Sequence, residues 1–564
     1  MNNFMLFCCS SVVLFTCAQR TLPPPCDSEI YCAGDILHQV QTAKLFDDDK
    51  YFVDMKLRAN PDIVLSAFHN LSSVSPNMTV PSTKLQEFLD TYFEKPGKEF
   101  ESWTPPDWHD KPKFLAKIAD QELHTWAEKI HHLWKSLGRK IRADVKDHPQ
   151  LYSQIYTPYP VIVPGGRFRE LYYWDSYWVI NGLLLSEMTD TAHGMIQNFL
   201  YLVNRHGFIP NGGRIYYERR SQPPFLTLMV ESYYEATKDK EFLRTALPVL
   251  EQEYQFWMQN RSVRVQANGK EHILNWYNVQ VGLPRPESYT DDLELAEGLS
   301  EDRREQLWAD LKAGAESGWD FSSRWYVDGE GSNNGSLRDT RTSHILPTDL
   351  NSLLCRNEKK LASFHRILGD GDSAALYDQA AARRLEAIEA VLWDAERGAW
   401  FDYNLVTHSS HFEFYPSNLA PIWAECFSQP AMGEKAVQYL KDSGALRFPN
   451  GVPTSLRESG QQWDYPNAWP PLQHMLIDGK NAKQVAFDLA QRWIKTNWMA
   501  YVKYEAMFEK CFIVLTVLQL GFGWTNGVAL QLLDQYGGSL TSGSSGVSSG
   551  FLLVVVFSAC LLSP

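Results

Sequence analysis

Six stretches of the chain gather carboxylates with arginine, tryptophan and amide side chains. They are "PGGRFRELYYWDSYW" (164–178), "IPNGGRIYYERRSQPP" (209–224), "LPRPESY" (283–289), "ESGWDFSSRW" (316–325), "GQQWDYPNAWPP" (460–471) and the stretch that opens with "YEAMFEK" at 504. Arginine offers a planar fork of donors, carboxylates accept, and tryptophan gives a flat apolar face, so together these side chains can read vicinal hydroxyls. Paired carboxyl groups in such surroundings suggest glycoside hydrolysis, in which one acid protonates the leaving oxygen and one carboxylate handles water.

No single stretch decides the chemistry. The run around Arg167, Glu170 and Asp175 could be a charged helix start, and most single tryptophans are core material. Asp320 stands between aromatic residues, where loss of hydration would raise its pKa and keep it protonated as an acid.

The residues of these stretches and their order along the chain resemble those of a known enzyme family. "PGGRFRELYYWDSYW" and "QWDYPNAWPP" resemble the two signature motifs of the trehalases, glycoside hydrolase family 37. "SGWDFSSRW", "RSQPP", "RPESY", "MFEK" and "GFGWTNGV" resemble further landmarks of that family in the right order, so the similarity covers residues 25 to 538.

The resemblance implies an (α/α)6 barrel with a loop-built active site, which hydrolyses α,α-trehalose to two glucoses with inversion and without cofactor or metal. It implies Asp320 as the general acid and Glu509 as the general base. An inverting pair should lie about 6.5–9.5 Å apart to admit the water. The residues that match the family's essential arginines and substrate contacts are Arg167, Arg220, Arg285, Trp174, Asp175, Asn211, Ser221, Gln222, Pro286, Glu287 and Gly318. We expect the arginines to clamp hydroxyls and to help keep Glu509 ionised.

The segment after Glu509 departs from the family pattern. A glycine-rich loop that closes over the sugar is replaced by a shorter apolar run, residues 511–518. Loss of a lid reduces water exclusion and ligand positioning. Two hypotheses therefore stand: an active trehalase that tolerates the altered segment, and a sugar-binding, weakly active or inactive relative.

Helical periodicity dominates the rest of the chain. In "FLAKIADQELHTWAEKIHHLWKSLGRKI" the apolar residues Ile118, Leu123, Trp126, Ile130 and Leu133 recur every three to five positions. Similar stretches continue to residue 538, and strand-like pieces are few and short. The sequence therefore predicts an all-α catalytic domain over 111–538 and a Pro-rich N-terminal segment over 19–110 that wraps the surface.

Charge excludes one class of partner. Lys and Arg number 53 against 67 Asp and Glu, a net charge of -14, whereas nucleic-acid binding needs basic footprints. We expect a small-molecule substrate and no nucleic acid; no oligomeric state follows from the sequence.

Both ends of the chain predict export. Residues 1–18 are typical of a signal peptide. A small polar spacer over 539–550 and an apolar tail over 551–564 are typical of a GPI-anchor signal, with Ser542 as the attachment site and Ser544 and Ser545 as rivals. A retained membrane span is the alternative, although about 20 residues are needed to cross. The predicted location is the extracellular face of the plasma membrane. The predicted N-glycosylation sites are Asn70, Asn77, Asn260 and Asn334.

Cysteine usage fits that location. Five cysteines remain between the predicted cleavage sites: Cys26, Cys32, Cys355, Cys426 and Cys511. Cys26 and Cys32 are near enough for a small disulfide loop, and the odd count leaves at least one thiol without an intrachain partner. No metal-ligand spacing is present.

Overall fold

A computed structural model describes residues 22–479, 482–512 and 522–543. The predicted signal peptide and apolar tail, and most of the altered run after Glu509, lie outside these ranges. Within them, no helix is long and apolar enough to span a bilayer.

Twelve helices of the described residues alternate between an outer and an inner position along the chain. The outer helices are α5 (Gln121–Leu137), α8 (Thr189–His206), α10 (Lys240–Asn260), α14 (Gly371–Val391), α16 (Pro430–Asp442) and α18 (Lys483–Tyr504). The inner helices are α7 (Asp175–Leu185), α9 (Leu226–Thr237), α13 (Thr348–Leu368), α15 (Ala420–Trp423), α17 (Pro470–Asp478) and α19 (Gly523–Tyr536).

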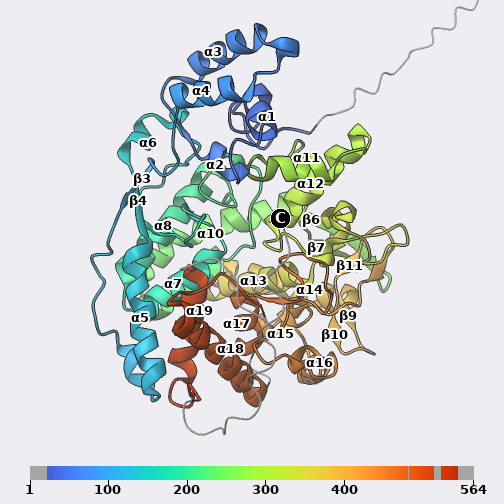
Figure 1. Cartoon of the computed structure of the whole chain (residues 1–564). Coiled ribbons are helices and arrows are strands. Elements are labelled where there is room, and N and C mark those ends of the chain that lie inside the picture. The colour runs from blue at the N-terminus through green and yellow to red at the C-terminus, as the bar shows by residue number, and fades with distance from the viewer. Residues whose placement is uncertain (1–21, 480–481, 513–521, 544–564) are drawn as a thin grey trace, which may run out of the picture.

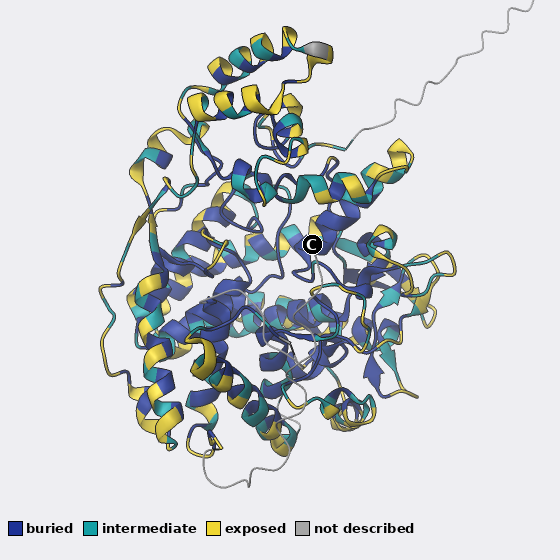
Figure 2. Ribbon diagram, viewed as in Figure 1, coloured by how far each residue is buried: buried dark blue, intermediate teal, exposed yellow. Residues whose placement is uncertain are grey.

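The inner helices form a closed ring. Each contacts the next in the order α7, α9, α13, α15, α17 and α19, and α19 returns to α7 (Figure 1). This arrangement is an (α/α)6 barrel, as predicted. Buried residues, dark blue in Figure 2, lie mainly toward the centre of the barrel, and exposed residues, yellow, lie mainly on the outside.

Sequence pattern separates the two layers. The outer helix α5 buries one stripe that includes Leu123, Trp126, Ile130 and Trp134, and Asp120 caps its first turn through Leu123 N–H. The inner helix α7 is apolar on nearly all sides, as a helix surrounded by others must be.

The last inner helix closes against the first at very short range. Gly527 of α19 lies against the main chain of α7, where an added Cβ would come within 2.0 Å of the Trp178 carbonyl oxygen. Gly182 of α7 faces it, and its own Cβ would lie 2.9 Å from the Gly527 Cα. Only glycine permits this approach of two backbones.

The N-terminal helices form a module with their own small core. They are α1 (Gly34–Thr42), α2 (Asp49–Val53), α3 (Pro61–Ser73) and α4 (Ser82–Tyr92). Their apolar faces bury Leu37, Phe52 and Leu89 together with Tyr172 and Tyr216 of the barrel side. We call residues 22–94 the N-terminal module; it covers the upper end of the barrel in Figure 1.

Three further helices and small antiparallel sheets lie between and before the barrel helices of the described residues. The additional helices are α6 (Ala143–Asp147), α11 (Tyr289–Leu295) and α12 (Glu301–Glu316). The strands are β1 (Lys56–Leu57), β2 (Phe93–Glu94), β3 (Phe100–Ser102), β4 (Gly138–Ile141), β5 (Val161–Ile162), β6 (Ser262–Ala267), β7 (Lys270–Asn275), β8 (Ile345–Leu346), β9 (Trp393–Asp394), β10 (Ala399–Trp400), β11 (Tyr403–Asn404), β12 (Ser409–Ser410), β13 (Asn467–Ala468) and β14 (Cys511–Phe512). The pairs are β1–β2, β3–β4–β5, β6–β7, β12–β11–β8, β10–β9 and β13–β14.

Two disulfides lie within the described residues. Cys26 pairs with Cys32, which confirms the predicted small loop, and Cys355 pairs with Cys426. Of the five cysteines in the described ranges, Cys511 is the free one, and its buried thiol has a pKa raised to about 12 by loss of hydration.

Candidate active site

Three of the inner helices start at one cavity. α7 starts at Asp175, α17 follows Trp469, and α19 starts one residue after Phe522; all three residues line the cavity. The loops that enter these helices thus bring motifs from distant parts of the sequence to one place.

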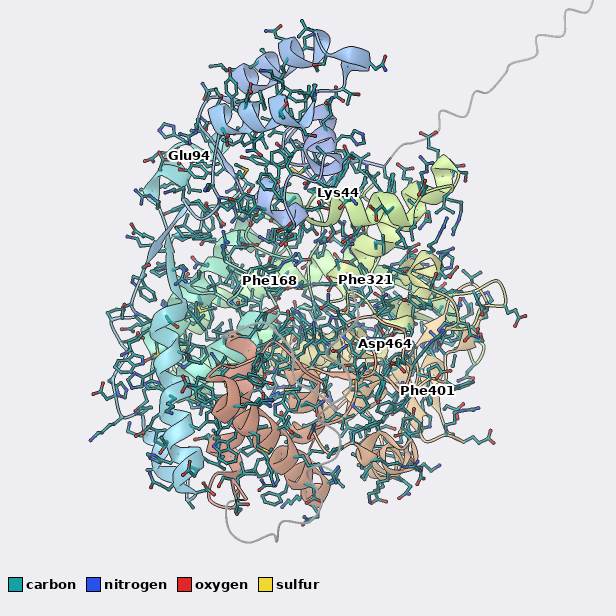
Figure 3. The ribbon with its side chains drawn as sticks, in the orientation of Figure 1. Lys44, Glu94, Phe168, Phe321, Phe401 and Asp464 are labelled. Carbon is teal, nitrogen blue, oxygen red and sulfur yellow. A yellow bond between two sulfur atoms is a disulfide. The ribbon has the colours of Figure 1, made fainter. Side chains whose placement is uncertain are left out.

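The cavity has a volume of about 890 Å³, which suits a small-molecule ligand. It contains all but two of the predicted catalytic and substrate-binding residues: Arg167, Trp174, Asp175, Asn211, Arg220, Gln222, Arg285, Glu287, Gly318, Asp320 and Glu509. Phe168 and Phe321 also line it, and Figure 3 labels both near the middle of the molecule, below the N-terminal helices.

Ser221 and Pro286 do not line the cavity. Ser221 is fully buried; its N–H donates to Glu316 at 2.9 Å and its Oγ to the Ile209 carbonyl at 2.7 Å. Pro286 offers its carbonyl to Gln41 Nε2 at 3.0 Å, so it joins the cavity loop to the N-terminal module. Both residues support neighbours that do line the cavity.

Two other acids of the motifs serve the scaffold. Glu170 is buried between Lys50 and Arg214, with its Oε1 at 2.8 Å from Lys50 Nζ. Asp464 accepts from Ser323 N at 2.6 Å and Ser322 Oγ at 3.0 Å. Their positions in the motifs therefore reflect loop construction.

Asp320 has the electrostatic setting of an acid. Burial raises its pKa to about 6, against the opposing effect of the Arg285 and Arg220 guanidinium groups, while Glu287 adds to the rise. The raised pKa was predicted from its aromatic neighbours. A carboxyl group in this range can hold a proton near neutral pH and donate it.

Glu509 has a different set of neighbours. Burial raises its pKa, and the Lys510 ammonium opposes that rise most strongly, followed by Arg167. We expected the three arginines to keep Glu509 ionised, but Arg220 and Arg285 act on Asp320 instead. That expectation was wrong for these two residues, because their loops place them on the acid's side.

A network of ion pairs orients the arginines. Arg220 donates to Glu287 Oε1 at 2.6 Å and to Asn211 Oδ1 at 2.8 Å. Burial alone would raise the Glu287 pKa, but Arg220 and Arg285 outweigh it and the net effect lowers the pKa. Glu287 therefore stays ionised and keeps the fork of Arg220 aimed along the cavity wall.

Arg285 is held by a residue that the sequence did not single out. Asp292 at the start of the same helical region accepts from the Arg285 main chain at 2.8 Å and from Nη2 at 2.6 Å. Asp292 is almost fully buried. No local signal identifies it, since its role depends on how α11 folds back over residue 285.

Asp175 lies among the acids of the cavity. Burial raises its pKa to about 8, and Glu509 and Asp320 both add to the rise. At neutral pH this carboxyl group carries a proton, and it can donate a hydrogen bond to a ligand oxygen.

Tryptophans build the floor. The rings of Trp463 and Trp469 stack at 4.0 Å, and Trp174 lies 5.7 Å from Trp463 and 5.8 Å from Trp524. Gly318, with φ +75°, passes under Trp174 so closely that a Cβ would lie 2.7 Å from its ring. Trp463, Trp469 and Trp524 stood in the motifs but were not predicted as site residues.

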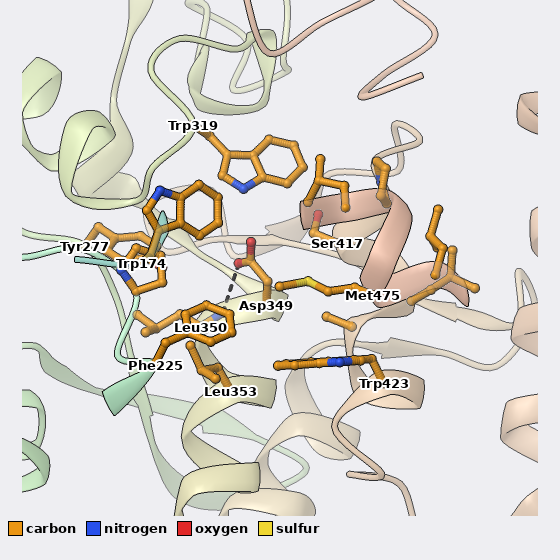
Figure 4. Close-up of a pocket in the computed structure, with 16 residues that line it drawn as sticks. Trp174, Phe225, Tyr277, Trp319, Asp349, Leu350, Leu353, Ser417, Trp423 and Met475 are labelled. Carbon is orange, nitrogen blue, oxygen red and sulfur yellow. Dashed lines mark hydrogen bonds between the residues drawn. The ribbon is translucent and has the colours of Figure 1, made fainter. Parts of the chain in front are cut away.

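A second, smaller cavity of about 30 Å³ shares Trp174 as a lining residue with the first (Figure 4). It is mainly apolar, with Trp319 and Trp423 among its walls. Asp349 is its charged lining residue and is held by both terminal nitrogens of Arg324 at 2.8 Å.

The altered segment 511–518 is described only at its start. Cys511 pairs with Ala468, and Phe512 with Asn467, in the β13–β14 ladder. The short strand sets the exit direction of the chain after Glu509. Residues 513–521 lie outside the described ranges.

The described architecture defines a class before any comparison. An (α/α)6 barrel whose entry loops bring an acid of raised pKa, a second carboxylate, arginine clamps and tryptophans to one cavity is a glycoside hydrolase. The trehalase family profile matches residues 44–537, and the chain belongs to the trehalase family.

Relatives span nearly the whole chain. It is 52% identical over 541 residues to trehalase from Oryctolagus cuniculus, covering 93% of each chain. It is 51% identical over 542 residues to trehalase from Homo sapiens, covering 93% of this chain and 92% of that one. The structure of neutral trehalase Nth1 from Saccharomyces cerevisiae aligns with a TM-score of 0.55 at 27% identity, over 67% of this chain and 75% of that one. These findings confirm the predicted family and barrel.

Proposed function

We propose that this chain hydrolyses α,α-trehalose to two glucose molecules with inversion at the attacked carbon. Membership of the trehalase family and the names of its relatives support the substrate. The observation that carries the mechanism is that Asp320 and Glu509 line one cavity in contrasting surroundings. Burial raises the pKa of both carboxyl groups, that of Asp320 to about 6, whereas the rise for Glu509 is opposed by the Lys510 ammonium in direct contact and by Arg167.

In this reaction Asp320 gives up one proton and Glu509 takes up another. Asp320 donates its proton to the oxygen shared by the two glucosyl rings, as the bond from that oxygen to one anomeric carbon breaks. Glu509 accepts a proton from the water that attacks this carbon from the opposite face. One product is β-glucose and the other α-glucose, and exchange with solvent returns both carboxyl groups to their starting states.

The clamps explain how the sugar is held. Arg220 and Arg285 donate from guanidinium groups that Glu287 and Asp292 hold in place, and Arg167 adds a third donor. Protonated Asp175 can donate a hydrogen bond, ionised Glu287 can accept, and the tryptophans cover the apolar ring faces. Binding energy from these contacts positions the shared oxygen near Asp320.

The test uses the full chain and measures glucose release from trehalose. Asp320→Asn and Glu509→Gln should each lower kcat by about 10²- to 10⁴-fold, the usual contribution of a positioned acid or base. Proton NMR during the first minutes should show equal amounts of α- and β-glucose. Two equivalents of α-glucose would contradict inversion.

The second hypothesis, a sugar-binding or inactive relative, rested on segment 511–518. The family comparisons favour the active enzyme. Protection of the full chain by trehalose against thermal unfolding, without glucose release, would instead support the binder.

We further propose that the mature protein is glycosylated and GPI-anchored outside the cell. The four predicted sequon asparagines are all exposed, which suits glycan attachment. Ser542 donates from N–H and Oγ to Asp120 at 2.8 and 2.9 Å, so the chain is held against α5 up to the proposed attachment site.

Expression of the full chain in animal cells tests this location. Phosphatidylinositol-specific phospholipase C should release the activity from intact cells. Activity that leaves the membrane only in detergent would instead indicate a retained span. Treatment with peptide-N-glycosidase should increase the electrophoretic mobility, and replacement of all four asparagines by glutamine should abolish that change.

A further inference from the structure

Lys510 follows the proposed base directly and has three partners in the cavity. Its Nζ lies 3.3 Å from Glu509 Oε2 and donates to Gln462 Oε1 at 2.6 Å. It also lies 4.7 Å from the centre of the Trp469 ring. Its side chain is only 15% exposed, so these contacts are made largely out of water. A flexible lysine with three simultaneous partners has lost the freedom of a surface side chain.

The main chain around Glu509 is fixed by other residues. Trp524 Nε1 donates to the Glu509 carbonyl at 2.9 Å, and Thr525 Oγ1 to the Phe508 carbonyl at 2.5 Å. The pairing of Cys511 with Ala468 anchors the following residue. A change in the Lys510 side chain therefore leaves the backbone supports of the base in place.

Charged groups face Glu509 from several elements. Lys510 on its own segment and Arg167 from the loop after β5 favour the carboxylate. Asp175 at the start of α7 is the acid that interacts with it, and Asp320 interacts with Asp175 in turn. Lys510 is the cation with a direct contact to the carboxylate, and it is the stronger of the two favourable charges.

The contact is also directional. Nζ approaches Oε2, which leaves Oε1 able to accept a proton from water. Gln462 comes from the neighbouring loop and holds the ammonium on its other side. The Trp469 face adds a cation–π contact, which strengthens when the cation is desolvated. These three contacts fix the ammonium where it stabilises charge on one carboxylate oxygen.

We propose that Lys510 is a positioning residue that keeps Glu509 ionised and oriented for water activation, with Gln462 and Trp469 as its anchors. The inference rests on the proposed function, because it assigns to Glu509 the role of base. It adds a determinant of the pH range: the Lys510 charge sets the acid limb of the activity profile. Loss of that charge moves the limb to higher pH, because an opposite charge within about 4–6 Å lowers a carboxyl pKa by about one to three units.

The experiment compares Lys510→Met with Lys510→Arg in the full chain. The acid limb of kcat/KM against pH should rise by about one unit or more in Lys510→Met, so that activity on that limb falls about tenfold. Lys510→Arg keeps the charge and should keep the limb within a few tenths of a unit. Gln462→Leu loosens the ammonium without removing it and should give a smaller shift. Lys503→Met removes an exposed charge outside the cavity lining and should leave the profile unchanged.

An infrared titration makes the test independent of turnover. The carboxyl band of Glu509 is isolated by subtracting the Glu509→Gln spectrum, and its midpoint should move upward in Lys510→Met. An unchanged midpoint, or an equal loss of activity at every pH, would overturn the inference. If the wild type releases no glucose, the proposed function fails while the titration still decides the role of Lys510.

Discussion

The main-chain N–H of Ser221 donates a hydrogen bond of 2.9 Å to Oε1 of Glu316, which lies 95 residues further along the chain. Glu316 is fully buried and also accepts from Arg261 Nε at 2.7 Å. Ser221 stands between Arg220 and Gln222 of the cavity, and Glu316 precedes the segment that carries Asp320. The Glu316 carboxylate therefore joins the segment that carries Asp320 to the segment that carries Arg220 and Gln222.

Glu316→Ala should therefore affect stability and catalysis together. Loss of the carboxylate leaves the Arg261 charge buried without its partner, and breaking such a pair costs about 3–5 kcal/mol. Urea unfolding should show this loss, and kcat/KM should fall in the surviving folded protein. Glu241→Ala removes an exposed carboxylate and serves as control. An unfolding midpoint equal to that of the control would contradict the bracing role.

Gly318→Ala should damage the active site more than a glycine change elsewhere. Its Cβ would meet Trp174 at 2.7 Å in addition to the strain of φ +75°. Gly369→Ala is a matched control, because Gly369 has φ +88° with no atom within 4 Å of the added Cβ. The control should cost about 1–2 kcal/mol from backbone strain alone. We expect a larger loss of stability in Gly318→Ala and a fall in kcat/KM that the control does not show.

Asp320→Asn should stabilise the protein at neutral pH although it lowers kcat. The folded state holds the Asp320 proton with a pKa of about 6, above the ordinary value of 3.8. Stability from this group is full at low pH and is lost as the pH rises through about 6. Asparagine does not ionise, and one pKa unit corresponds to about 1.4 kcal/mol, so the variant should exceed wild type by about 2–3 kcal/mol at pH 7.5.

Chemical unfolding at pH 4.5 and 7.5 measures this difference. The advantage of Asp320→Asn should be clearly smaller at pH 4.5. Asp62→Asn, at an exposed position of α3, provides the control for a lost surface charge. An advantage that is the same at both pH values would argue that the buried carboxyl is not the cause.

The two disulfides should differ in their contributions to stability. Cys355 and Cys426 close a loop with a sequence separation of 71, whereas Cys26 and Cys32 are separated by 6. In the chain-entropy model the longer loop contributes about 4 kcal/mol and the shorter about 2 kcal/mol. Thermal unfolding of the Cys355→Ala/Cys426→Ala and Cys26→Ala/Cys32→Ala variants compares them. A larger loss in the second variant would show that local structure outweighs loop entropy.

The all-α class could be predicted from local periodicity, whereas the barrel and most cavity residues were implied by the resemblance of the loop motifs to those of the trehalases. Helical periodicity marks α5, and the loop motifs keep their order and residue types. The β6–β7 hairpin was missed, although "VRVQANGKEHI" alternates around an Asn-Gly turn with positive φ at both turn residues.

The supporting acids could not be predicted in the same way. Asp292 and Glu316 act through contacts with segments whose proximity depends on the closed ring and on α11 and α12. The positions of Glu170 and Asp464 in the motifs suggest contacts with a ligand. In the structure both are buried, and they interact with Lys50 and Ser323 instead. The residue type determines which interactions a side chain can make, and the packing of distant segments determines which partners it meets.

The tight contact between α7 and α19 gives this protein a late step in its biosynthesis. A ribosome delivers α7 early, but the partner that covers its Gly182 face emerges only with Gly527. Until then the first inner helix lacks its neighbour on that side, and the last residues supplied to the cavity are Glu509, Lys510, Phe522 and Trp524. The nascent chain therefore acquires its catalytic pocket only after α19 has been synthesised, and a product that stops before α19 has an open ring for quality control to recognise.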